Sequence, residues 1–155
     1  MKDYTMTEVS MNKNMKLSEH FTLGELTKTS YKTEDENIPS RVAIENLKNL
    51  CENWLEALRQ AQGPLIINSG YRSPEVNKKA WGSATSNHLT GCAVDIRVGG
   101  FEQAIRYASI LLDISDGTKR DYDELYIERN SVGRYWIHFA VRPKDNRRKV
   151  GFLQT

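Results

Sequence analysis

The sequence contains few of the residues that mark specialised classes of protein. Its 155 residues include only two cysteines and four prolines, and two cysteines are too few for a scaffold built on disulfide bonds. No stretch approaches the roughly 20 consecutive apolar residues that a membrane-spanning helix needs. The N-terminal residues also lack the apolar core of a secretory signal. We therefore expect a protein without a membrane span that is synthesised in the cytoplasm without a signal peptide.

The sequence also lacks an excess of charge of one sign. The formal net charge is +2, with 27% charged and 39% hydrophobic residues, as in an ordinary soluble globular domain. The basic residues are spread along the chain, so we expect no nucleic-acid partner. We also expect the protein to be a monomer. We interpret the densest basic cluster, Arg147 to Lys149, as a solvated tail. We interpret Cys51 and Cys92 as small buried apolar residues.

The length of the chain suits one domain with a single core. Residues 1–15 are polar and lack apolar periodicity, which predicts a flexible N-terminal arm before a domain at 16–155. Thr22 and Glu25 fit a capping box for a short helix, and residues 29–39 are predicted to form a loop. Apolar periodicity and turn residues then predict helices at 40–62, 75–80 and 101–112 and strands at 65–67, 92–98, 122–128 and 135–141. This order predicts an α+β fold with N-terminal helices packed on a small, mostly antiparallel sheet.

Two polar residues in the middle of the chain are candidates for metal binding. His88 and Asp95 are seven residues apart, and a loop that turns back into a strand would bring their side chains together. Gly91 between them would permit both the turn and a close approach of the backbone. Asp95 stands among apolar residues of a predicted strand, where a carboxylate is costly unless a cation or hydrogen bonds compensate it.

A second histidine has a similar setting. His138 lies within the apolar strand predicted at 135–141, whereas the remaining histidine, His20, is interpreted as a surface residue. A single histidine in an apolar strand is usually a core residue, but two such histidines and an interior aspartate favour a metal site. Two imidazoles and one carboxylate, with a fourth position left to water, form the ligand set of many catalytic zinc sites. Non-haem iron uses the same ligands, so these residues alone leave the choice of metal open.

Three motifs, in order along the chain, resemble those of the zinc D-Ala-D-Ala carboxypeptidase family, which shares its metal site and core fold with the Hedgehog signalling domain. They are Ser69-Gly70-Tyr71-Arg72-Ser73, Ser86-x-His88-x-x-Gly91-x-Ala93-x-Asp95 and Trp136-Ile137-His138. The segment LSEHFTLGEL at residues 17–26 also resembles the opening of compact bacterial and phage members. The resemblance extends over about residues 16–143 and implies a fold like that of Hedgehog and the DD-peptidases.

The resemblance implies roles for particular residues. His88, Asp95 and His138 match the ligands of a Zn²⁺ ion. Arg72 matches an arginine that binds the carboxylate of the substrate, and a guanidinium can hold a carboxylate through two parallel hydrogen bonds. Ser86 matches a serine that supports the site or polarises the carbonyl group of the bond to be cut.

The family pattern is broken at one position. Several members carry an acidic residue, the general base, three positions before the last histidine ligand, where this chain has Tyr135. In compact relatives the acidic residue lies on the preceding strand, which makes Glu128 the candidate base. Strand alternation puts Glu128 and His138 on one face of the sheet only if the register of the hairpin allows it, so a surface position for Glu128 stays open. Asp123, and after it Glu124, is the candidate to orient a ligand histidine.

The resemblance as a whole implies a zinc metallopeptidase that hydrolyses peptide bonds in the stem peptides of bacterial peptidoglycan. Its catalytic residues would be Glu128 and Arg72, with Arg72 and Ser86 binding the substrate. The reaction would be that of a D-Ala-D-Ala carboxypeptidase or of an endolysin-type endopeptidase, acting on the cell wall after export or release by lysis. Tyr135 keeps an alternative open, namely a non-catalytic zinc-containing module that binds the cell wall or forms part of a phage particle.

Overall fold

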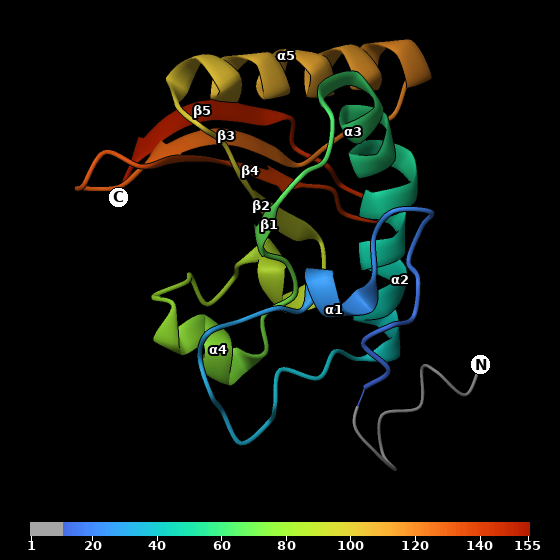
Figure 1. Cartoon of the computed structure of the whole chain (residues 1–155), viewed down its shortest axis with the longest axis vertical. Coiled ribbons are helices and arrows are strands. Elements are labelled where there is room, and N and C mark those ends of the chain that lie inside the picture. Colours follow the sequence, from blue (N-terminus) through green and yellow to red (C-terminus); the bar gives the residue numbers. More distant parts are fainter. Residues whose placement is uncertain (1–10) are drawn as a thin grey trace.

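The computed structural model describes residues 11–155, in which five strands form one sheet (Figure 1). The strands are β1 (Ile67–Ser69), β2 (Ala93–Arg97), β3 (Glu124–Arg129), β4 (Tyr135–Ala140) and β5 (Lys149–Gln154). Their order in the sheet is β1-β2-β4-β3-β5. The first four of these pair antiparallel with their neighbours, and β5 pairs parallel with β3. The predicted α+β fold with a small, mostly antiparallel sheet is confirmed.

Within residues 11–155, five α-helices accompany the sheet, and three of them begin at a side-chain cap. They are α1 (Leu23–Leu26), α2 (Arg41–Leu50), α3 (Glu56–Gln62), α4 (Pro74–Lys79) and α5 (Phe101–Thr118), with a π-helical turn η2 (Cys51–Leu55) between α2 and α3 and a 3-10 turn η3 (Asn87–Thr90) before β2. Thr22 and Glu25 form the capping box of α1, and Ser40 caps α2. In Figure 1, α5 lies along β3 and β4, whereas α4 lies well away from it, below the sheet. Within residues 11–155, no helix has the length and apolarity of a membrane span.

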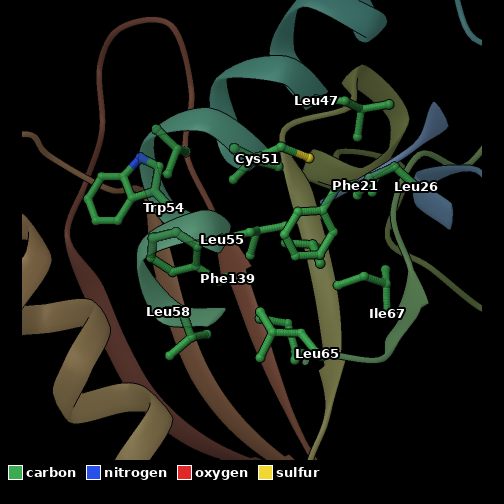
Figure 2. Close-up of a cluster of buried hydrophobic side chains, with 14 of the residues drawn as sticks. Phe21, Leu26, Leu47, Cys51, Trp54, Leu55, Leu58, Leu65, Ile67 and Phe139 are labelled. Carbon is green, nitrogen blue, oxygen red and sulfur yellow. The ribbon is translucent and has the colours of Figure 1, made fainter. Parts of the chain in front are cut away.

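The core fills the space between α2, η2 and α3 and one face of the sheet. Figure 2 shows Trp54 of η2 beside Phe139 of β4, with ring centroids 4.9 Å apart, and both side chains are fully buried. Fully burying an aromatic side chain of this kind stabilises the fold by roughly 1.5–3 kcal/mol. Cys51 in the same cluster and Cys92 are buried free thiols, which confirms their interpretation as small core residues. This packing commits one face of β3 and β4 to the core and leaves the other face for polar residues.

Several elements differ from the prediction, and three of them are instructive. β1 begins two residues late, because Ile67 is buried and pairs with β2 whereas Ile66 is 48% exposed. The helix predicted to end at residue 112 instead continues to Thr118, the last residue of α5. In this extra part, the hydroxyl of Ser115 donates to the carbonyl oxygen of Arg120 and accepts a hydrogen bond from Arg148. We did not predict β5, because its parallel pairing with β3 joins distant segments that no local turn connects.

Met11 and the basic cluster make contacts that the sequence did not predict. Met11 is buried in the core. Residues 1–10 of the predicted arm lie outside the described residues, so the predicted domain boundary at residue 15 stays a prediction. Arg147 binds Asp123, and Arg148 binds Asp121. The cluster is exposed, as expected, but it is not a tail, because it leads into β5 and its two arginines bind acidic residues that precede β3.

Candidate metal centre and active site

The polar face of the sheet carries most of the candidate residues. In the ladder between β3 and β4, Tyr126 pairs with His138 and Glu128 pairs with Trp136. On the other side of β4, Asp95 of β2 pairs directly with His138. Because side chains alternate between the two faces of a strand, these five side chains share the face that points away from the core. They line a cavity of about 570 Å³.

His88 reaches the same cavity from η3, which directly precedes β2. Ser86 caps this turn, since its Oγ accepts a hydrogen bond from the backbone N–H of His88 at 3.1 Å. Gly91 ends the turn with a φ of 73°, and a Cβ there would lie 2.4 Å from the carbonyl oxygen of Ala43. The turn and the close backbone approach predicted at Gly91 are both confirmed, and only glycine meets both demands without strain.

The three predicted ligands lie together. Oδ1 of Asp95 is 3.3 Å from Nε2 of His88 and 3.0 Å from Nδ1 of His138, and the three candidate ligand atoms lie within 4.8 Å of one another. Ligand atoms at about 2.1 Å from a tetrahedral metal ion are about 3.4 Å apart. All three side chains are buried. The spacing and the donor types therefore fit a small divalent cation.

Hydrogen bonds turn one ring nitrogen of each histidine toward Asp95. Nδ1–H of His88 donates to the carbonyl oxygen of Gly70 at 2.6 Å, so Nε2 is the nitrogen that faces the site. Nε2–H of His138 donates to Oε1 of Glu124 at 2.8 Å, which leaves Nδ1 facing Asp95. Partners of this kind fix the tautomer and the ring orientation of metal-binding histidines.

Glu124, rather than Asp123, orients His138. Asp123 directly precedes β3, and of the two carboxylates it is that of Glu124 that contacts the imidazole, although Nδ2 of Asn87 and Nη2 of Arg147 donate to both. Asp123 is fully buried, and its carboxylate accepts hydrogen bonds from the guanidinium of Arg147 at 2.7 and 2.9 Å. Our preference for Asp123 is therefore wrong, and Glu124 is the residue that orients His138.

The environment of the cavity shifts the pKa values of its charged groups. Burial by itself raises the pKa of Asp95, but His88 and His138 hold it well below its usual range. Burial by itself lowers the pKa of His138, but its hydrogen bonds with Asp95 and Glu124 raise it to about 10. Burial and the negative charge of Asp95 both raise the pKa of Glu128. The cavity thus holds the carboxylate of Asp95, whose pKa is lowered and which stays ionised, and the carboxylate of Glu128, whose raised pKa lets it bind a proton more readily.

Glu128 lies beside the three candidate ligands. Its Oε2 is 3.9 Å from Nδ1 of His138, and its side chain is 14% exposed, so a free surface position for Glu128 is excluded. Tyr135 points to the opposite face of β4 and packs against Phe101 of α5, with ring centroids 5.3 Å apart. The position that is acidic in several relatives therefore cannot reach this cavity, whereas Glu128 can.

Arg72 lies at the edge of the same group. Its Nη2 donates to Oδ2 of Asp95 at 3.2 Å, its Nε donates to Oγ of Ser69 at 3.1 Å, and its Nη1 lies 3.5 Å from Oδ1 of Asn77. Among residues 11–155, these contacts engage three of the five N–H groups of the guanidinium. Arg72 also lines the cavity, so its remaining donors are available to an anionic ligand.

Two aromatic residues of the cavity were not predicted. Tyr126 stacks on the ring of His138, with centroids 5.6 Å apart and an interplanar angle of 15°. Trp81, which is 93% exposed, lies at the rim with a φ of 60°. The strand alternation that put Glu128 on the face of the cavity also puts Tyr126 there. For Trp81, by contrast, no pattern in the sequence distinguishes an exposed position at the cavity from a position in the core.

The comparisons with known proteins agree with this geometry. The sequence profile of the peptidase M15 family matches residues 19–120, a range that includes His88 and Asp95 and ends before His138. The chain is also 29% identical, over 125 residues, to the zinc D-Ala-D-Ala carboxypeptidase of Streptomyces albus G. That match covers 76% of this chain and 48% of the relative, so the chain spans about half the length of the curated protein that it matches.

Proposed function

Because the chain belongs to the peptidase M15 family, we propose that it is a zinc-dependent peptidase that hydrolyses peptide bonds in the stem peptides of bacterial peptidoglycan. The observation that carries this proposal is the buried group of His88, Asp95 and His138, whose ligand atoms face a cavity that also contains Glu128 and Arg72. When bound there, zinc would polarise a peptide carbonyl and lower the pKa of a coordinated water toward about 7.

Glu128 performs the proton transfers in the proposed reaction. Its carboxylate accepts a proton from the attacking water and delivers it to the leaving amine as the peptide bond breaks. The position of Glu128 beside His138 supports this role, as does the semi-buried setting of its carboxylate. Neither Glu124, which is held by His138, nor Asp95, which faces both histidines, is available for it.

Arg72 and Ser86 bind the substrate in the proposed reaction. The free N–H groups of Arg72 hold a carboxylate, so the bond that is cut lies close to a negative group. Stem peptides carry carboxylates both at a D-Ala terminus and on side chains, which suits a D-Ala-D-Ala carboxypeptidase and an endolysin-type endopeptidase. Ser86 holds the backbone of His88 through its Oγ, and within residues 11–155 its hydroxyl proton has no acceptor, so it can donate to the substrate. The enzyme would meet the cell wall after export or release by lysis.

The test is digestion of purified peptidoglycan, and of a stem peptide ending in D-Ala-D-Ala, by the zinc-loaded protein. Mass spectrometry distinguishes the two modes, because a carboxypeptidase releases single D-Ala residues and an endopeptidase releases shortened stems. We expect about one zinc per chain in the wild type and in His20→Ala, which alters an exposed histidine outside the cavity, but loss of zinc in His88→Ala. Glu128→Gln should keep its zinc and lose roughly 10²- to 10⁴-fold in kcat.

Other outcomes would contradict the proposal. Binding to peptidoglycan without any cleavage would favour a non-catalytic cell-wall-binding module. Absence of both zinc and peptidoglycan binding would favour a structural protein with an inactive site.

A further inference from the structure

One buried side chain holds the backbone on both sides of Arg72. Asn37, in the loop before α2, is 2% exposed. Its Oδ1 accepts a hydrogen bond from the N–H of Ser73 at 2.7 Å, and its Nδ2 donates to the carbonyl oxygen of Tyr71 at 3.2 Å. Nδ2 also donates to the carbonyl oxygen of Thr27 at 2.8 Å. The carboxamide therefore ties the turn that carries Arg72 to the N-terminal part of the domain.

The same turn is bonded to a candidate metal ligand. The carbonyl oxygen of Gly70 accepts the hydrogen bond from Nδ1–H of His88, and the backbone N–H of Arg72 donates to the carbonyl oxygen of His88 at 3.0 Å. Movement of residues 70–73 would therefore change the position of Arg72 relative to His88. Asn37 bonds to the backbone groups of this segment that His88 does not, at Tyr71 and Ser73, so it limits that movement.

The local structure around Asn37 is suited to this task. Its φ of 52° lies in the left-handed region, which asparagine tolerates better than most residues. Its backbone N–H donates to Oδ1 of Asp35 at 3.1 Å. A reversed carboxamide would place its NH₂ group against the N–H of Ser73, so the partners determine which end is the oxygen. The side chain therefore has one orientation, and in that orientation every donor and its acceptor are satisfied.

We propose that Asn37 is a positioning residue for substrate recognition. By bonding to Tyr71 and Ser73, it fixes the guanidinium of Arg72 at a set distance from the group of His88, Asp95 and His138. A carboxylate bound to Arg72 is then held at one distance from the bond to be cut. This inference rests on the proposed role of Arg72 and names a further residue on which that role depends.

The first test follows the position of Arg72 without any reaction. Asn37→Gly removes the carboxamide while keeping a backbone that tolerates a positive φ. Ser115→Ala is the control, because it removes two hydrogen bonds of a buried side chain on α5 that does not line the cavity. We expect the Nε–H signal of Arg72 in the NMR spectrum to exchange with water about tenfold faster in Asn37→Gly. The rate in Ser115→Ala should equal that of the wild type. An unchanged rate in Asn37→Gly would overturn the inference, whether or not the protein cleaves peptides.

The second test measures substrate choice on matched peptides that end in a free carboxylate or in an amide. In the zinc-loaded wild type, kcat/KM should favour the carboxylate, and Asn37→Gly should reduce this preference roughly 10- to 100-fold by misplacing Arg72. Arg72→Ala should abolish the preference, and adding Asn37→Gly to it should reduce the preference no further. Equal losses on both peptides in Asn37→Gly would mean that Asn37 supports only the fold. A wild type that cleaves neither peptide would refute the carboxypeptidase form of the proposed function, and the exchange rate of Arg72 would still decide the role of Asn37.

Discussion

At the scale of single residues, the acidic side chains of the cavity differ in their partners, and these partners determine what each can do. Asp95 divides its two oxygens, with Oδ1 toward the histidines and Oδ2 toward Arg72. Glu124 is occupied by the ring of His138. Glu128 has a looser contact, 3.9 Å from the same ring. Asp95 thus suits metal binding, Glu124 suits orientation of a ligand histidine, and Glu128 suits proton transfer.

The role of Glu124 predicts a selective effect on metal affinity. Glu124→Ala removes the acceptor that orients His138, so we expect zinc affinity to fall roughly 10- to 100-fold. Glu128→Gln changes a carboxylate of the same cavity that does not hold the ring, and it should bind zinc as tightly as the wild type. Competition with a chromophoric chelator measures both affinities. Equal affinities in the two variants would contradict the assignment of Glu124.

Asp123 predicts how stability depends on acid. Burial by itself raises its pKa, but hydrogen bonds from Arg147 and Asn87 hold the pKa at about 2 in the folded protein. An unfolded Asp titrates near 3.9, so the stabilisation is complete above about pH 4 and is lost as the pH falls toward 2. We expect the difference in unfolding free energy between the wild type and Asp123→Asn to shrink by roughly 1 kcal/mol from pH 5 to pH 3. Urea denaturation measures it, and a constant difference would show that the carboxylate has no lowered pKa.

At the scale of elements, local patterns predicted the face of the sheet on which the site lies, but not every partner on it. The alternation in β3 and β4 put Glu128 and His138 on one face, and the antiparallel hairpin places them together. The same alternation puts Glu124 on the face of Glu128, so our preference for Asp123 went against it, whereas the register of the hairpin stayed open because the connection at 130–134 does not determine it. Asn37 looked like an ordinary loop residue because its partners, Tyr71 and Ser73, are more than 30 residues away.

The turn between η3 and β2 predicts that Gly91 is sensitive to substitution. Gly91→Ala would combine a left-handed φ with a Cβ that lies 2.4 Å from the carbonyl oxygen of Ala43, so we expect a loss of more than about 2 kcal/mol of stability. Gly63→Ala has no neighbour within 4 Å, but its backbone, with φ 89° and ψ −174°, lies in a region essentially restricted to glycine, so it should cost about 1–3 kcal/mol. Gly117→Ala lies in α5 with no neighbour within 4 Å and should stabilise by roughly 0.5–1 kcal/mol. Chemical denaturation measures the three, and a loss of less than about 1 kcal/mol in Gly91→Ala would contradict the role of close packing at Gly91.

At the scale of the whole molecule, the candidate metal centre joins parts of the chain that are distant in sequence. His88 comes from η3, Asp95 from β2 and His138 from β4, and the turn of Arg72 is tied to His88 and, through Asn37, to the N-terminal loop. A cation bound by three such segments stabilises their shared arrangement, because the unfolded chain does not bring the ligands together. Metal binding and global stability should therefore be coupled.

This coupling predicts the effect of a chelator on thermal unfolding. A ligand that binds only the folded state stabilises it by about 2.7 kcal/mol when its concentration is 100 times Kd, and each kcal/mol raises Tm by roughly 2–4 °C for a chain of this size. We therefore expect removal of zinc to lower Tm by about 5–10 °C in the wild type. His20→Ala should show the same decrease, because its imidazole contacts Glu56 on α3 rather than the centre. His88→Ala should have a Tm that zinc does not change, and a wild type with equal Tm values in zinc and in chelator would show that these three side chains do not bind the metal.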